Sequence, residues 1–121
     1  MALRNVVFEG QVAYEELPAV LHAARVGLMP FIDSRVNRGR SPMKLYEYLA
    51  AGLNVVAPDF MCRVPSGLAH HVFGYASASD IPEALAAAMA APPVGREGFG
   101  QLAESDWAAK ALELQRFVLA I

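Results

Sequence analysis

The chain has 121 residues, 55% of them hydrophobic and 18% charged, with a formal net charge of -2 at pH 7. These totals are typical of one small globular domain. They exclude a disordered tail and, because the chain is not basic, argue against a nucleic-acid partner. No apolar run approaches the ~20 residues of a membrane span, and no signal peptide is recognisable.

The first part of the chain predicts two strands on either side of a helix. Residues 5–10 form a short apolar run that ends on a glycine, which is typical of a strand. Residues 14–24 repeat apolar side chains at helical spacing, with two glutamates in the first turn, where the helix dipole favours negative charge. Residues 26–31 predict a second strand, buried on both faces.

A polar loop over residues 32–40 leads to a helix predicted over residues 42–51. Ser41 and Pro42 are typical of an N-cap and a first helical residue, because serine accepts hydrogen bonds from free backbone N–H groups and proline presets φ. Gly52 is the expected stop of this helix.

The second half of the chain begins with a third strand at residues 54–58 and a fourth at residues 71–76. Asp80 caps a helix that continues to residue 90, and the sequence from 91 to 100, rich in proline and glycine, predicts a loop.

A closing helix is predicted from about 105 to 120, capped by Ser105 or Asp106. Its apolar residues recur at helical spacing, and Trp107 is interpreted as an anchor that packs against the domain. The predicted apolar face consists of Trp107, Ala111, Leu114, Phe117 and Val118.

The alternation of apolar strands and helices predicts an α/β fold, with a Rossmann-like open parallel sheet and flanking helices. We expect a single domain over residues 1–121, with its core in residues 5–90. Ligands of such sheets bind at the carboxyl ends of the strands. Because the loop over 32–40 follows the carboxyl end of the second strand, the functional site is expected there.

Positive charge is concentrated at this place, since Arg35, Arg38, Arg40 and Lys44 fall within ten residues. A helix N-terminus offers unpaired backbone N–H groups and about half a positive charge, and cations beside it favour an anion such as phosphate. Alternatively, the cluster is a solvated face on which Lys44 and Glu47 form a weak surface pair. The residues alone leave both interpretations open.

Glu47 lies on the same helix face as Lys44. A carboxylate at this position repels phosphate but accepts hydrogen bonds from ribose or sugar hydroxyls. Cations together with one acid therefore suit a nucleotide or a nucleotide-sugar, whose base or ribose Met43 could touch. We expect Ser41 on the phosphate side of this site.

The sequence SPMKLYEYLAAG at residues 41–52, followed by NVVAP at 54–58, closely resembles the donor-site signature of GT-B glycosyltransferases of bacterial polysaccharide assembly. The upstream segments NVVFEGQV, YEELP and VGLMPF match the carboxyl-terminal domain of that family in order and spacing. The resemblance is firm over residues 5–60 and loose afterwards. It implies a partial GT-B carboxyl-terminal domain that binds a nucleotide diphosphate sugar, such as a UDP-sugar.

The resemblance also implies roles for single residues. Lys44 would contact the donor diphosphate, Arg38 would help to neutralise the same charge, and Glu47 would hold the ribose. Many relatives carry a second glutamate, eight residues before the first, that touches the transferred sugar. That position is Gly39 in this sequence, so this contact is absent or is supplied by another residue.

The family's donor domain normally begins with two further strands and follows a separate acceptor-binding domain. By this resemblance the chain starts at the third strand. We therefore expect exposed sheet edges, a missing amino-terminal acceptor domain as partner, and little or no turnover by the isolated chain. Any peripheral association with a membrane would come through the full-length protein.

We expect no metal and no other cofactor, because cations already serve the diphosphate and the sequence has no Asp-x-Asp motif. His22, His70 and His71 lack partners at ligand spacing. The single cysteine, Cys62, indicates a reducing compartment, so a cytoplasmic location is expected. Two alternatives remain open: a non-catalytic nucleotide- or phosphate-binding module, and a fragment of a nucleotide-sugar epimerase.

Overall fold

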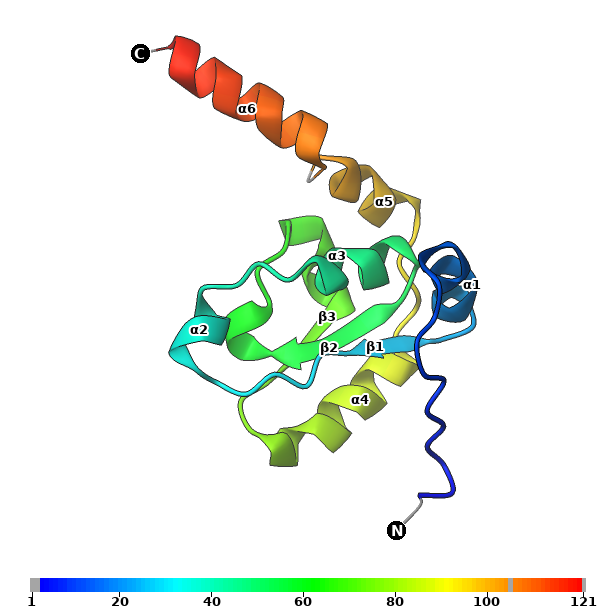
Figure 1. Ribbon diagram of the computed structural model, residues 1–121. Helices are drawn as coiled ribbons and strands as arrows, with labels where there is room; N and C mark the ends of the chain where they lie inside the picture. Colours follow the sequence, from blue (N-terminus) through cyan, green and yellow to red (C-terminus); the bar gives the residue numbers. More distant parts are fainter. Residues whose placement is uncertain (1–2, 105, 121) are drawn as a thin grey trace.

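The computed structural model describes residues 3–104 and 106–120. At its centre lies a sheet of three parallel strands in the order β1–β2–β3. The strands are β1 (Val26–Leu28), β2 (Asn54–Pro58) and β3 (Val72–Tyr75). The fold is a Rossmann-like α/β arrangement with an open parallel sheet and flanking helices, as predicted (Figure 1).

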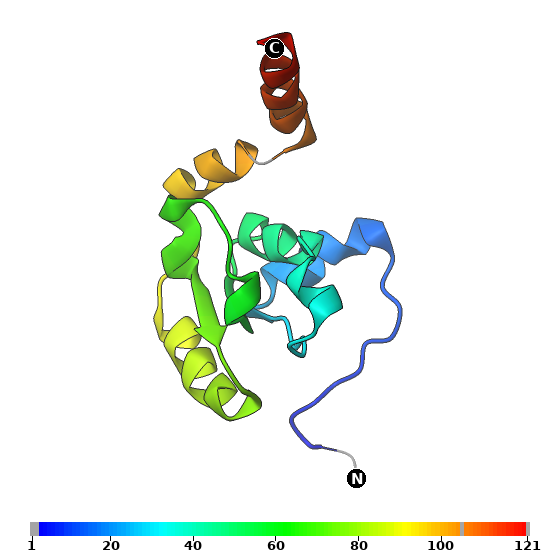
Figure 2. The same cartoon turned by 90° about the vertical axis from the view of Figure 1, so that its left-hand side faces the viewer.

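Helices cover both faces of this sheet: α3 (Met43–Ala50) lies on one face and α4 (Ile81–Ala90) on the other (Figure 1). The last two helices lead away from the sheet, and α6 extends beyond the rest of the molecule (Figure 2). The remaining helices are α1 (Leu17–His22), α2 (Arg35–Arg38), α5 (Arg96–Ala103) and α6 (Trp107–Leu119), with 3-10 turns at Tyr14–Glu16, Asp59–Met61, Ser66–His71 and Ala78–Asp80.

The central strand β2 is buried along its whole length, which explains why its residues after Asn54 are all apolar. Successive side chains of a strand point to opposite faces of the sheet. Val55 and Ala57 therefore pack on the α3 side with Leu45 and Leu49, whereas Val56 packs on the α4 side. This core fixes α3 against the sheet and so positions the candidate site.

Asn54, the first residue of β2, connects three parts of the fold, and its side chain is only 2% exposed. Its Nδ2 donates to the backbone oxygens of Ala88, Ala91 and Pro92 at 3.0, 3.1 and 3.1 Å. Its Oδ1 lies 2.8 Å from Nδ1 of His71. Because the amide oxygen can only accept, His71 donates from Nδ1. The end of α4 and the start of β3 are thereby fixed to the central strand.

The predicted strand at residues 5–10 is wrong. These residues are not in a strand, and Phe8 is 92% exposed. Among the strands that the structure describes, none lies beside this segment, so its backbone groups have no ladder to join. Strand β1 stands at the edge of the described sheet and pairs with β2 alone.

Two other predicted elements end earlier than expected. The strand predicted over 26–31 ends at Leu28, because Pro30 has no N–H group and the N–H of Phe31 turns back to the oxygen of Met29 at 2.9 Å. The helix predicted over 14–24 begins with a 3-10 turn and ends at His22.

The strands predicted at residues 54–58 and 71–76 are confirmed, the second as Val72–Tyr75. The helix predicted from Asp80 to residue 90 is confirmed as α4. Its cap is different, because Asp80 forms a capping box with Ser77 around the preceding 3-10 turn, and no side chain caps α4 itself.

The loop predicted over 91–100 is wrong in its second half, where α5 begins at Arg96. Gly98 makes this packing possible. A Cβ at this position would lie 2.7 Å from Cγ1 of Val94 and 2.9 Å from Cδ2 of Leu68. The glycine that predicted a loop therefore lets a helix approach the core.

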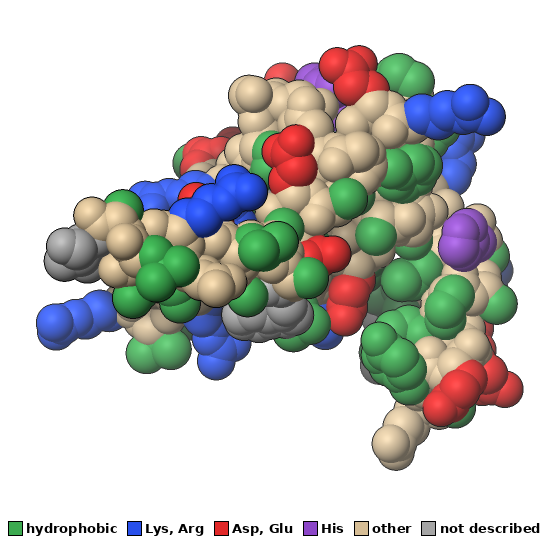
Figure 3. Space-filling view, turned by 90° about the horizontal axis from the view of Figure 1, so that it is seen from above, with side chains coloured by type: hydrophobic (Ala, Val, Ile, Leu, Met, Phe, Trp, Pro, Cys, Tyr) green, Lys and Arg blue, Asp and Glu red, His purple; other side chains and the backbone are tan. Residues whose placement is uncertain are grey.

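The closing helix is confirmed as α6, and Asp106 caps it by accepting a hydrogen bond from the N–H of Ala109 at 2.8 Å. Ser105 and the side chain of Trp107 lie outside the described residues. The other residues of the predicted apolar face do not pack against the domain: Ala111, Leu114, Phe117 and Val118 are exposed, Phe117 to 68%. Seen from above, hydrophobic side chains lie open to solvent on this side of the molecule (Figure 3). Within the described residues, no helix has the length and apolarity that a bilayer span requires.

Candidate functional site

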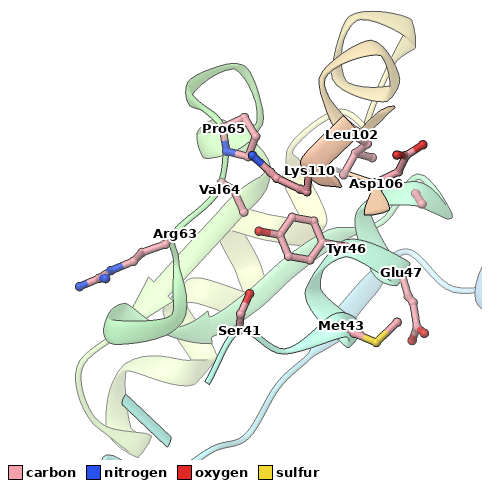
Figure 4. A pocket seen from close by; sticks show the side chains of 11 residues that line it. Ser41, Met43, Tyr46, Glu47, Arg63, Val64, Pro65, Leu102, Asp106 and Lys110 are labelled. Atoms are coloured by element: carbon pink, nitrogen blue, oxygen red, sulfur yellow. The ribbon is translucent and has the colours of Figure 1, made fainter. Parts of the chain in front are cut away.

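A pocket of about 730 Å³, here called the α3 pocket, lies between α3, the segment after β2 and the last two helices (Figure 4). Its volume is typical of a site for a small organic ligand, and its walls are mainly apolar with charged groups at the rim. It is lined by Ser41, Met43, Tyr46, Glu47, Ala50, Arg63, Val64, Pro65, Leu102, Asp106 and Lys110.

The structure gathers three of the five predicted site residues in this pocket: Ser41, Met43 and Glu47. Arg38 and Lys44 are not among its lining residues. Both residues predicted for the ribose or base thus line the pocket, whereas both predicted diphosphate cations stand outside it. A smaller pocket of about 260 Å³, between α1 and the end of α3, shares Glu47.

The start of α3 differs from the prediction. Pro42, in an extended conformation, holds the N-cap position, and no side chain caps the helix. The predicted N-cap role of Ser41 is therefore wrong, because this serine lies one residue too early. Met43 and Lys44 are exposed, so the first turn, with its free backbone N–H groups, is open to solvent. An anion has access to this turn.

Arg38 is engaged by a neighbour that the sequence interpretation did not consider. Its Nε donates to Oδ1 of Asp33 at 2.6 Å, and its Nη2 contacts the other carboxylate oxygen. These hydrogen bonds, strengthened by the opposite charge, lower the pKa of Asp33 and raise the pKa of Arg38. The guanidinium also lies 6.0 Å from the ring centroid of Phe60, within the range of a cation–π contact.

Tyr75 positions the segment that leads from β1 to this site. Its hydroxyl lies 2.9 Å from the oxygen of Met29 and 3.2 Å from the oxygen of Phe31, and its single proton is shared between these two acceptors. Tyr75 is the last residue of β3, so the end of one strand fixes the exit of another two positions away in the sheet.

Tyr46 stands in the middle of the α3 pocket, with Val64 and Pro65 to one side of its ring and Glu47 to the other (Figure 4). Lys110 extends from α6 across the space above this ring. Tyr46 follows Leu45 and precedes Tyr48, both of which belong to the core or pack against it. Tyr46 is thus the aromatic residue that α3 turns toward the pocket.

The rim of the pocket carries a cation from α6. The Nζ of Lys110 donates to Oε2 of Glu113 at 2.9 Å. This hydrogen bond, assisted by the negative charge of Glu113 and more weakly by other acidic neighbours, raises the pKa of Lys110. The group is therefore a cation at neutral pH.

The outer wall of the pocket is fixed to the core through α5. The N–H of Gly67 donates to Oε1 of Gln101 at 3.0 Å, and Leu102 packs against the core cluster on the α3 side of the sheet. Sequence reasoning missed this wall, because residues 63–65 and 102–110 approach α3 only through tertiary packing. The amphipathic pattern of α6 was visible, but it gave no sign of where that helix would lie.

Other groups with possible chemistry are not assembled into a site. Among the described residues, no cluster of three or more His, Cys, Asp or Glu side chains is suited to hold a metal ion. Burial, with a smaller effect from the charge of Asp59, raises the pKa of Cys62 to about 11, so it remains a thiol at neutral pH.

A family model described as "Glycosyl transferases group 1" matches residues 2–91. The chain belongs to the group 1 glycosyl transferases. The match includes all three strands of the described sheet, α3 and the loop that carries Arg38. It ends just after α4, so Leu102, Asp106 and Lys110 of the α3 pocket lie outside the matched residues.

A relative with a similar sequence is also named as a glycosyltransferase. The glycosyltransferase TuaH of Bacillus subtilis (strain 168), named for teichuronic acid biosynthesis, is 38% identical to this glycosyl transferase over 59 residues. The aligned part is 49% of this chain but only 15% of TuaH. No solved structure matches the chain.

Proposed function

We propose that the chain is the donor-binding, carboxyl-terminal part of a glycosyl transferase and that it binds a nucleoside diphosphate sugar along α3. Family membership supports sugar transfer. The observation that carries the donor assignment is the α3 pocket, which brings Ser41, Met43 and Glu47 together beside an open helix start. In this proposal Glu47 accepts hydrogen bonds from the ribose, and Lys44 and the free N–H groups of α3 face the diphosphate.

The chemistry follows from where charge develops. As the bond between the sugar and the diphosphate breaks, negative charge grows on the leaving phosphate. The backbone N–H groups of the first turn of α3 stabilise that charge, because the helix holds them in place before the reaction begins, and the exposed Lys44 adds positive charge beside them. Arg38 can join them by exchanging Asp33 for phosphate, and the exchange is easy because exposed ion pairs are weak. The proposed diphosphate site therefore needs no divalent metal.

The proposal also covers the donor, the acceptor and the process in which the full protein acts. The donor is a UDP-sugar, the acceptor is held by a separate amino-terminal domain, and the full protein acts in polysaccharide synthesis in the cytoplasm. The printed name of TuaH, which refers to teichuronic acid biosynthesis, supports polysaccharide synthesis. On this proposal the chain alone binds donor but transfers little or no sugar.

Calorimetric titration of the chain with UDP tests the proposal. Lys44→Ala should weaken UDP binding about tenfold, which is the usual loss for a charge-assisted phosphate contact. Glu47→Gln should weaken UDP and uridine but not inorganic pyrophosphate. Arg25→Ala is the matched control, since it removes one positive charge beside the amino end of β1, where Arg25 donates to the oxygen of Met89. Equal UDP affinity in the Lys44 variant and the wild type would refute the phosphate assignment.

A further inference from the structure

The lining of the α3 pocket is largely apolar, which phosphate binding does not explain. The apolar walls are formed by Met43, Val64, Pro65 and Leu102, and among the described lining residues Tyr46 is the only aromatic one. Aromatic side chains are usually packed in a core or used at an interface. Tyr46 stands at the pocket, so the structure offers a flat aromatic surface to a ligand.

The neighbouring tyrosine of α3 shows the difference. A Cβ added at Gly27 would lie 2.3 Å from Cδ2 of Tyr48, so the Tyr48 ring lies directly against the sheet. Tyr48 also packs against the core cluster, to which Tyr46 does not belong. One tyrosine therefore holds α3 on the sheet, and the other faces the cavity two residues earlier.

We infer that Tyr46 is a stacking platform for the nucleobase of the donor, with Val64 and Pro65 forming the opposite wall. This inference rests on the proposed function and extends it to the base. Every nucleobase has a planar face that stacks on an aromatic ring. Glu47 lines the same pocket on the side of the ring away from Val64 and Pro65, so the ribose of a base stacked on Tyr46 can reach the carboxylate.

This order also accounts for the positions of the predicted cations. Glu47 and Ser41 lie on opposite sides of Tyr46, with Met43 between them at the start of α3 (Figure 4). A nucleotide with its base on Tyr46 and its ribose at Glu47 can extend its diphosphate past Met43 to the open first turn, beside Lys44. The diphosphate cations are therefore expected outside the apolar pocket, where the structure has them.

The rim of the pocket supplies polar partners for the edge of a base. Lys110 uses one of its three N–H donors on Glu113, which leaves two for a ligand, and Asp106 offers a carboxylate beside it. Heteroaromatic bases carry both acceptors and donors at their edges. The apolar pocket is bordered by donors, Lys110 and Arg63, and by acceptors, Asp106 and Glu47, so it offers partners for both kinds of group at the edge of a base.

Titrations of the chain with UDP, GDP and ADP, with the matching nucleosides and with inorganic pyrophosphate test this inference. For the diphosphate that binds most tightly, Tyr46→Ala should lower the affinity about tenfold, with a similar loss for its nucleoside. Pyrophosphate affinity should stay within about twofold. Tyr46→Phe should retain nucleotide binding, because the ring remains. Tyr14→Ala is the matched control, since Tyr14 is 79% exposed and lies outside the α3 pocket.

The outcomes separate this inference from the function on which it rests. If nucleoside diphosphates bind but Tyr46→Ala leaves their affinity unchanged, stacking on Tyr46 is refuted and the donor assignment stands. Equal losses for nucleotide and pyrophosphate would show a structural role and also refute stacking. Tyr46-dependent binding of an oligosaccharide, with unchanged nucleotide binding, would make the pocket an acceptor site instead. If the wild-type chain binds neither nucleotides nor pyrophosphate, both proposals fail.

Discussion

Replacing Asn54 with alanine should lower the free energy of unfolding by about 3 kcal/mol. The side chain has four partners, and two of these contacts are buried: the oxygen of Ala88 and Nδ1 of His71. Each buried polar group left without a partner costs about 1–3 kcal/mol. The oxygens of Ala91 and Pro92 are only partly buried, so water can replace the amide there. Two buried groups at about 1.5 kcal/mol each give the expected loss.

The measurement is urea unfolding followed by far-ultraviolet circular dichroism, with linear extrapolation to water. Asn37→Ala is the matched control. The Nδ2 of Asn37 donates to the oxygen of Ile32 at 2.9 Å in an exposed position, so its loss should cost less than about 1 kcal/mol. If Asn54→Ala costs no more than this control, the oxygen of Ala88 and the ring of His71 find other partners. The account of Asn54 as a connecting residue would then be wrong.

Two further predictions concern other parts of the core. Burial, reinforced by the charge of His70, lowers the pKa of His71 in the folded chain, whereas the unfolded chain protonates near the ordinary value of about 6.5. The unfolded state therefore binds more protons than the folded state below about pH 6.5, so acid should destabilise the fold. The midpoint of urea unfolding should be lower at pH 5 than at pH 7.5, and the decrease should be smaller in His71→Gln. A midpoint that rises on acidification would contradict this. Gly27→Ala should cost about 1–3 kcal/mol, because the new Cβ would overlap the ring of Tyr48, while Gly100→Ala, with no atom within 4 Å of its Cβ, should be nearly neutral. Thermal unfolding of both variants checks this pair, and equal melting temperatures would contradict it.

The sequence predicted best the elements whose local pattern agrees with their packing. Residues 55–58 are all apolar because β2 is buried on both faces. The apolar period of α3 follows from Leu45 and Leu49, which both reach the core. In these elements the apolar residues are the ones that become buried, so the spacing of apolar residues was sufficient to predict the secondary structure.

Prediction failed where tertiary contacts decide the local structure. The run at 5–10 has the composition of a strand, but a strand needs a neighbour, and none of the described strands lies beside it. Glycine-rich sequence predicted a loop before residue 100, yet Gly98 is the residue that lets α5 approach Val94 and Leu68. Composition alone does not distinguish a glycine that frees the backbone from one that makes room for a neighbour.

The candidate site shows the same division. Met43 and Glu47 were found because their spacing on one helix is local information, and both line the α3 pocket. Asp33, the partner of Arg38, lies in the same loop, but the sequence does not show that the loop folds so as to bring the two side chains together. Tyr46 lies on the same helix, but its sequence context does not separate it from a packing residue. Only the arrangement of α3, residues 63–65 and α6 shows the open space beside its ring.

The outer wall of the α3 pocket is attached to the core through the bond from Gly67 to Gln101 and the packing of Leu102. The shape of the cavity thus depends partly on Gly67 and Gln101, which do not line it. A substitution that breaks this attachment would lower the affinity for a ligand, and the loss would look like that of a substitution in a binding residue. A mutational scan of the site therefore needs a separate measurement of whether α5 still packs against the core. Only then can a loss of ligand affinity be assigned to a lost direct contact.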